Sequence, residues 1–211
     1  QAPHLRLAAF PGLVACRPDQ APELLKNALL GEDDALRIAA LNIVRKGRGS
    51  KNVVKTLADS LADLPPDIQV QAIGALADRG EHAAAPGIRQ QVASDNQKVR
   101  FAAIRALGSI GRSDSIPVLI DRLYKTEDEN EVTVVSEALA RMTGEHIGDS
   151  IVNQINIASS EKVRRTLIDV AADRNQKSAI PALIKALDLQ DPETRAAAAL
   201  ALNHIGRTQD F

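Results

Sequence analysis

The sequence contains few aromatic side chains, one cysteine and no excess of charge. Aromatic residues make up 2% of its 211 positions and tryptophan is absent, so few rings could stack on bases or flat ligands. Lys and Arg total 26 and Asp and Glu total 27, a net charge of −1. This balance supplies no bulk attraction to nucleic acid or to an anionic membrane. We therefore expect no nucleic-acid partner.

The single cysteine, Cys16, excludes an intrachain disulfide and leaves the redox compartment open. It lies among apolar residues with no histidine close in sequence, which favours buried packing over a nucleophile or a metal ligand. No apolar run reaches the length that spans a bilayer. The cellular location therefore stays undetermined.

The chain does contain a helical motif that recurs every 31 or 32 residues. Equivalent reference positions are Arg6, Arg37, Gln69, Arg100, Val132, Arg164 and Arg195. Apolar residues three, seven and ten positions later form one stripe of a helix. Glycines at or near the predicted helix ends favour a left-handed stop; they are Gly47, Gly80, Gly111, Gly144 and Gly206.

A second helix is predicted between successive copies of this motif. Four of these helices carry a proline in one column of the repeat, near the first turn, where the missing N–H costs little; they are Pro22, Pro86, Pro117 and Pro181. Short acidic or polar turns such as Asp33-Asp34 and Asp191-Pro192 follow, and we interpret them as N-caps of the next helix. The pattern predicts stacked helical hairpins.

Two near-complete copies of the motif resemble the HEAT repeat in its short bacterial form, which is also seen in phycobilisome lyases. They are the segments 95–111, continued by 116–123, and 180–187. The resemblance implies an all-α, right-handed α-α superhelix of about seven stacked hairpins, HEAT/armadillo-like, over residues 1–211 as a single array. Val132 and Gln69 depart from the repeat's arginine, and Pro11 should kink or end the first helix. Because both ends are apolar and uncapped, we expect a segment of a longer protein.

The resemblance also implies a concave face lined by the helices that carry the reference positions. Residues one, five and nine positions after each reference position should point outward there, apolar toward the N-terminal half and mixed in charge toward the other. The candidate binding residues on this face are Asn42, Lys46, Phe101, Arg105, Glu137, Arg141, Asp169 and Asp173.

The charged segments and the histidines are better explained by structural roles than by a functional site. The basic segment from Arg45 to Lys51 with Lys55 could bind an anion at a helix start, but a charged turn explains it more simply. The acidic run Glu127–Glu131 fits a solvated turn and cap. His82 and His146 lie two repeats apart, about 20 Å for layers 8–10 Å thick, too far to share a metal ion. We expect no catalytic residue, cofactor or metal.

Three functions remain under consideration. The first is a non-catalytic module or scaffold that binds a protein or peptide, or other domains of its own chain, along the concave face. The second is an accessory domain of a multidomain enzyme or a phycobilin lyase-like enzyme, for which the few aromatic residues and single cysteine give little support. The third is a nucleic-acid-binding HEAT-like module, which the net charge of −1 disfavours.

Overall fold

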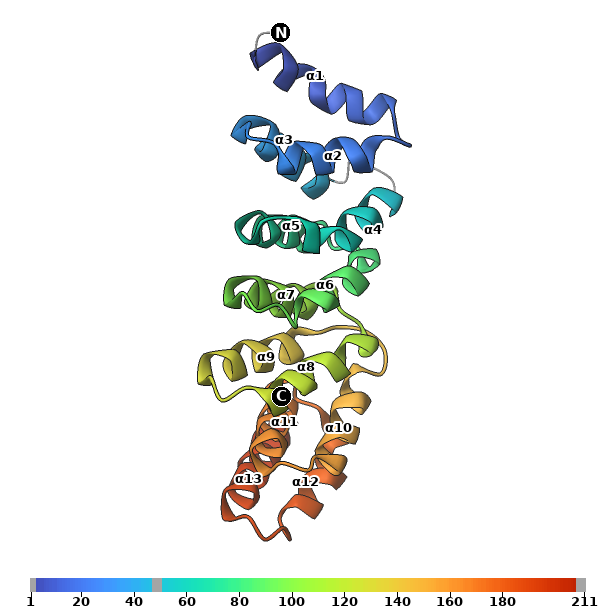
Figure 1. Cartoon of the computed structure of the whole chain (residues 1–211). Coiled ribbons are helices and arrows are strands. Elements are labelled where there is room, and N and C mark those ends of the chain that lie inside the picture. The colour runs from blue at the N-terminus through green and yellow to red at the C-terminus, as the bar shows by residue number, and fades with distance from the viewer. Residues whose placement is uncertain (1–2, 47–50, 208–211) are drawn as a thin grey trace. The chain divides into compact units, whose positions relative to one another are not determined.

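The computed structural model describes residues 3–46 and 51–207, and this part of the chain contains helices and no strand (Figure 1). The α-helices are α1 (Pro3–Cys16), α2 (Ala21–Leu30), α3 (Asp34–Arg45), α4 (Lys51–Asp59), α5 (Pro66–Arg79), α6 (Ala85–Gln91), α7 (Gln97–Ile110), α8 (Ile116–Lys125), α9 (Glu129–Arg141), α10 (Ile147–Ile157), α11 (Glu161–Asp173), α12 (Ile180–Ala186) and α13 (Pro192–Arg207). Short 3₁₀ turns precede α6, α8 and α12 and follow α4.

The odd-numbered and even-numbered helices are the two predicted helices of the repeat. Every reference position lies in an odd helix, and the four column prolines lie in the first turn of α2, α6, α8 and α12. The chain forms two compact units, Gln1–Ile110 and Gly111–Phe211. Within each unit, odd helices pack on the next odd helix and even helices on the next even one. The predicted all-α, HEAT/armadillo-like fold is confirmed.

The polar turns before the odd helices act as N-caps, as predicted. The Asp33 carboxylate accepts hydrogen bonds from the N–H groups of Ala35 and Leu36 at the start of α3. Equivalent caps come from Asn96, Asp128, Ser160 and Asp191. A side-chain oxygen here satisfies backbone donors that the first helical turn leaves free.

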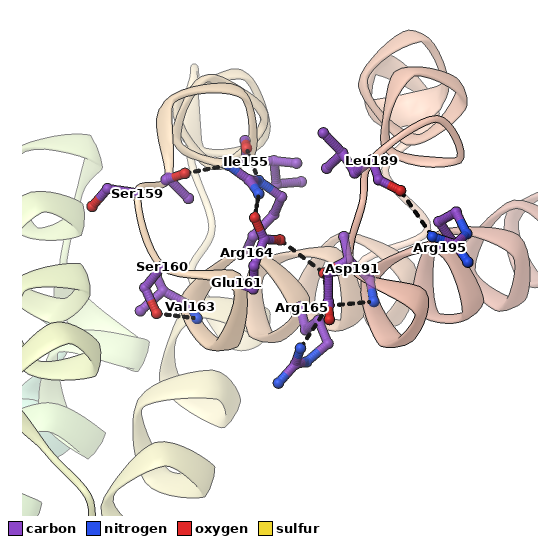
Figure 2. A network of polar contacts seen from close by, with 12 residues as sticks. Ile155, Ser159, Ser160, Glu161, Val163, Arg164, Arg165, Leu189, Asp191 and Arg195 are labelled. Carbon is purple, nitrogen blue, oxygen red and sulfur yellow. Dashed lines mark hydrogen bonds and ion pairs between the residues drawn. The ribbon is translucent and has the colours of Figure 1, made fainter.

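The reference arginines of α3, α7, α11 and α13 bind backbone carbonyls at the end of the preceding helix or in the turn after it. Arg37 donates to the carbonyl of Leu29 at 3.3 Å and to that of Gly31 at 2.6 Å. Figure 2 shows the same arrangement for Arg164, which donates to Ile155, and for Arg195, which donates to Leu189 at 3.0 Å. The guanidinium satisfies carbonyls that a helix C-terminus leaves without a partner.

The two repeats that lack this arginine use other side chains. Gln69 donates from Nε2 to the carbonyl of Leu61 at 2.9 Å, so an amide takes over part of the role. The side chain of Val132 has no hydrogen-bond donor. Its neighbour Glu131, which is 1% exposed, instead accepts hydrogen bonds from Arg122 at 2.8 Å and Thr126 at 3.3 Å. These substitutions explain how the repeat tolerates both departures.

The first helix departs from the predicted register. The apolar column seven residues after the reference position is buried at Val44, Leu76, Leu107, Leu139 and Ala171. In α1, however, Leu13 is 38% exposed, because Phe10 and Val14, one turn apart, are the buried residues. Cys16 is exposed, so its predicted burial is wrong: two residues beyond Val14, it points to the opposite side of the helix. Pro11 lies inside α1 and does not end it.

The glycine prediction holds in part. Gly80 ends α5 in the left-handed conformation with φ 75°. Gly144 also has a positive φ, but it lies beyond the end of α9 at Arg141. Gly111 does not have a positive φ. Gly206 lies inside α13, one residue before Arg207, the last described residue of this helix. Gly47 lies outside the described residues. No helix in the described ranges is both long and apolar enough to cross a membrane.

Candidate functional site

The outward-pointing columns of the odd helices lie on the surface of each unit. Of the eight candidate binding residues, seven are exposed and Phe101 is half-buried. Their helices present them because the stripe three, seven and ten residues after each reference position packs inward. We refer to the residues one, five and nine positions after each reference position as the odd-helix face of their unit.

In the first unit, α7 carries two of the candidates as a stacked pair. The Arg105 guanidinium carbon lies 5.6 Å from the centre of the Phe101 ring, a cation–π distance between residues one helical turn apart. This contact orients the charged group on an exposed helix surface. The structure thus brings these two candidates together on one helix.

The other two candidates of the first unit line a hollow between α1 and α3. It has a volume of about 270 Å³, and its walls are Leu7, Pro11, Ala39, Asn42, Ile43 and Lys46. The lining is mostly apolar, with the Asn42 amide and the Lys46 ammonium as its polar groups. Such a hollow can accept an apolar side chain while a polar group at the rim fixes its orientation.

In the second unit, α9 presents a neutral ion pair. Arg141 donates to Glu137 at 3.0 Å, and both side chains are about half exposed. An i,i+4 pair of this exposure contributes little to stability. The two candidates therefore form one polar patch with no net charge.

The candidates on α11 line a larger hollow, between α11 and α13. Its volume is about 670 Å³; its lining consists of Asp169, Ala172, Asp173, Leu200, Ala201, Asn203, His204 and Arg207. Partial burial, together with the nearby carboxylate of Asp173, raises the pKa of Asp169, and the positive charge of Arg165 opposes the shift. The carboxylates of Asp169 and Asp173 lie on the α11 wall, and the side chains of His204 and Arg207 lie on the α13 wall.

Some lining residues of both hollows were not among the candidates. Ile43, Asn203 and Arg207 are examples. They lie beside the outward columns and not on them, and a hollow between two helices is bordered by such flanking positions. The helical period predicts which side of a helix faces outward, but the depth between helices depends on the packed side chains.

The remaining sequence features have structural roles or fall outside the description. His82 Nδ1 lies 2.7 Å from the carbonyl oxygen of Ile110, and His146 takes a left-handed conformation before α10.

Lys162 pairs with Glu127 and Glu129 of the acidic run. In the basic segment, Arg45 pairs with Asp78 and Lys55 with Asp59, whereas positions 47–50 and the Lys51 side chain are not described. Among the described residues, no group of three His, Cys, Asp or Glu could hold a metal ion.

A family model described as HEAT repeats matches residues 54–140 and 149–210, which is more than half of the chain. This chain belongs to the HEAT-repeat family. The match includes the two near-complete copies of the motif, so the resemblance read from those residues is confirmed. No curated protein matches the sequence.

Among solved structures, the complex of CpcE and CpcF of phycocyanin lyase from Nostoc sp. PCC7120 is similar to this HEAT-repeat chain. The identity is 23%, the TM-score is 0.51, and the match covers 88% of this chain and 77% of the other. A designed armadillo repeat protein in complex with the peptide (KR)4 is 18% identical with a TM-score of 0.45, over 87% and 98% of the two chains. At these identities the similarity concerns the fold.

Proposed function

We propose that this HEAT-repeat chain is a non-catalytic interaction module that binds a protein or peptide along its odd-helix faces. The observation that carries the proposal is the pairing of exposed columns with hollows. In each unit, two candidate residues at one odd helix border a hollow of a few hundred Å³, and the adjacent odd helix forms its other wall. A surface with shallow hollows for side chains and scattered polar groups suits an extended polypeptide.

The repeat architecture supports this role. Each repeat contacts its neighbours, so the same side of every odd helix recurs along a unit and forms an extended surface. Extended surfaces of this kind are how helical-repeat proteins typically engage partners. The two units present different chemistry, because the first exposes Phe101 and Arg105 and the second exposes two carboxylates on α11. Each unit would then bind a partner segment of different chemistry.

A peptide-display experiment tests the proposal. Peptides selected for binding to the protein should lose at least tenfold in affinity against a face variant that combines Asn42→Ala, Phe101→Ala, Glu137→Ala and Asp169→Ala. The loss is expected because truncating a few central contact residues removes most of the binding free energy of an interface. Affinity is measured by fluorescence anisotropy, with thermal unfolding as the check on folding.

The matched control changes four exposed residues of even helices: Asn27→Ala, Thr56→Ala, Gln90→Ala and Asn153→Ala. Selected peptides should bind this control as tightly as the unchanged protein. Equal binding to both variants, or loss against the control alone, would place the binding surface elsewhere and contradict the proposal. Appearance of a bound-bilin absorbance band on mixing with free phycobilin would favour the lyase-like alternative.

A further inference from the structure

The odd-helix face of the first unit carries unpaired positive charge. Asp78, the acidic residue of this face on α5, is paired with Arg45, whose Nε lies 2.8 Å from Oδ2. In contrast, the side chains of Lys46 on the C-cap of α3 and of Arg105 on α7 make no ion pair or hydrogen bond within the described ranges. Nearer the helix starts, the exposed residues Asp67 and Lys98 balance each other in charge. The face is therefore net positive.

An apolar row crosses the same face, about one helical turn from Arg105 and about two turns from Lys46. It consists of Ile38, Val70 and Phe101, one from each of α3, α5 and α7. Ile38 is 58% exposed, and the other two are half-buried. An exposed isoleucine in line with two partly exposed apolar side chains is a strip on which apolar side chains of a partner can be buried.

Helix α5, which lies between α3 and α7, has a glycine and no side chain at the centre of this face. Gly74 on α5 occupies the position that Asn42 holds on α3 and Arg105 on α7. A Cβ built at Gly74 would meet no atom within 4 Å. A peptide backbone could therefore pass over α5 without meeting a side chain at this position. The hollow between α1 and α3 continues the apolar lining beyond Lys46.

We propose that the odd-helix face of the first unit binds an extended segment of a partner protein that combines acidic and apolar side chains. This inference rests on the proposed function and adds the chemistry of the partner. The segment's carboxylates pair with Lys46 and Arg105, and its apolar side chains lie on the row of Ile38, Val70 and Phe101. Charge complementarity selects the acidic partner, and the contact with Phe101 holds the Arg105 guanidinium in place for it.

The spacing of the two cations predicts the spacing of the acidic residues. They lie on α3 and α7, and α5 packs directly between these helices. Two interhelical distances of about 8–10 Å, with an offset of about 6 Å because Lys46 lies one turn further along its helix than Arg105, place them roughly 17–21 Å apart. An extended chain advances about 3.3–3.5 Å per residue, so the two carboxylates should be about five or six residues apart.

The direct test uses a blocked, fluorescently labelled heptapeptide with the order glutamate, leucine, threonine, leucine, threonine, leucine, glutamate. Matched peptides carry glutamine or lysine in place of both glutamates. Anisotropy titration of the full chain should give an affinity about tenfold higher for the glutamate peptide than for the glutamine peptide, with the lysine peptide weakest. The preference should shrink as salt increases, because exposed charge pairs are screened.

Substitutions then assign the contact to the two cations. Lys46→Gln and Arg105→Gln should each weaken binding of the glutamate peptide by about two- to fivefold, as for exposed ion pairs. Lys55→Gln, which removes an exposed cation from α4, should leave the affinity unchanged. The double variant Lys46→Glu with Arg105→Glu should reverse the preference and bind the lysine peptide best. Thermal unfolding of each variant confirms that it is folded.

Several outcomes overturn the inference. These are equal affinity for the three peptides, no binding of any of them, tighter binding of single-stranded DNA than of the glutamate peptide, or a dimer of this chain that Lys46→Glu with Arg105→Glu abolishes. If only the acidic peptide fails while display-selected peptides still depend on the odd-helix faces, the proposed function stands. If selected peptides also ignore those faces, the proposed function fails with it.

Discussion

At the scale of single residues, a close contact between α4 and α6 in the first unit depends on a glycine. A Cβ at Gly87 of α6 would lie 2.3 Å from the carbonyl oxygen of Ala58 in α4. Backbone cannot move aside as a flexible side-chain end can. At Gly148 the equivalent clash involves the end of the Gln176 side chain, which can rotate. Gly87 is therefore required by packing, whereas Gly148 is not required to the same degree.

Gly87→Ala should destabilise the protein by about 1–3 kcal/mol, because an added methyl group forces apart two packed helices. Gly74→Ala provides the matched control in the same unit. Its Cβ enters open space in the middle of a helix, where alanine is preferred to glycine by about 0.5–1 kcal/mol. Urea unfolding should therefore move in opposite directions for the two variants. A similar loss in both would contradict the close contact at Gly87.

At the scale of an element, side chains of the odd helices bind backbone carbonyls at the end of the preceding helix or in the turn after it, and these contacts hold the hairpins together. Arg100 donates to the carbonyls of Ser94 and Asp95 at 2.9 and 3.2 Å. Gln69 performs a similar task with a single amide donor. Where the reference residue makes this contact, a long side chain with a hydrogen-bond donor is sufficient and a positive charge is not needed, whereas the Val132 repeat relies on Glu131 instead.

Arg100→Leu should lower the free energy of unfolding by about 1–3 kcal/mol, because it removes the donor to the part-buried carbonyl of Ser94 and to the exposed carbonyl of Asp95. Arg100→Gln should lose less, since the amide can replace one hydrogen bond as it does at Gln69. Denaturant unfolding measures both. If glutamine is as costly as leucine, the contribution of Arg100 comes from its charge, and the hydrogen-bond explanation is wrong.

A second element-scale contact joins the starts of α11 and α13 in the second unit (Figure 2). The hydroxyl of the buried residue Thr194 lies 2.6 Å from Asp191 and 3.0 Å from Glu161, and Arg165 donates to Asp191 at 2.7 Å. Hydrogen bonds from Thr194, with a further one from Arg165, lower the pKa of Asp191. The ion pair with Arg164 and the bond from Thr194 lower the pKa of Glu161.

These shifts predict acid sensitivity. Because both pKa values are lower in the folded state, the stabilisation is complete above the unfolded-state values near 4 and is lost as the pH falls through the folded-state values. The melting temperature should therefore fall between about pH 5 and pH 2. Asp191→Asn should make this fall less steep, whereas Asp188→Asn, which removes an exposed carboxylate close by, should not. Identical pH profiles for the two variants would contradict the assignment.

At the scale of the whole molecule, each helix packs on its neighbours within two compact units. In such arrays the stability is approximately a sum of repeat and nearest-neighbour contributions. A local defect should therefore remain local. That residues 1–211 form a single HEAT-like repeat array stays a prediction.

Hydrogen–deuterium exchange should show this locality. Gly87→Ala should speed exchange in α6 and in α4 and α7, which pack on it, and leave α11 and α13 unchanged. Peptide-resolved mass spectrometry of the native protein measures it. A uniform increase across all described helices would show that the chain unfolds as one cooperative unit, against the repeat description.

The sequence by itself predicted the order of the helices, the side-chain N-caps of α3, α7, α9, α11 and α13, and the outward side of the odd helices from α3 onward. Those features follow from a 3.6-residue period and from short-range hydrogen bonds, which neighbouring residues in the chain specify. Only the tertiary structure decided that Cys16 is exposed, that Leu13 lies outside the core, that Arg105 stacks on Phe101 and that hollows open between particular odd helices. These depend on how side chains from different helices fill the space between them, which a one-dimensional period does not encode.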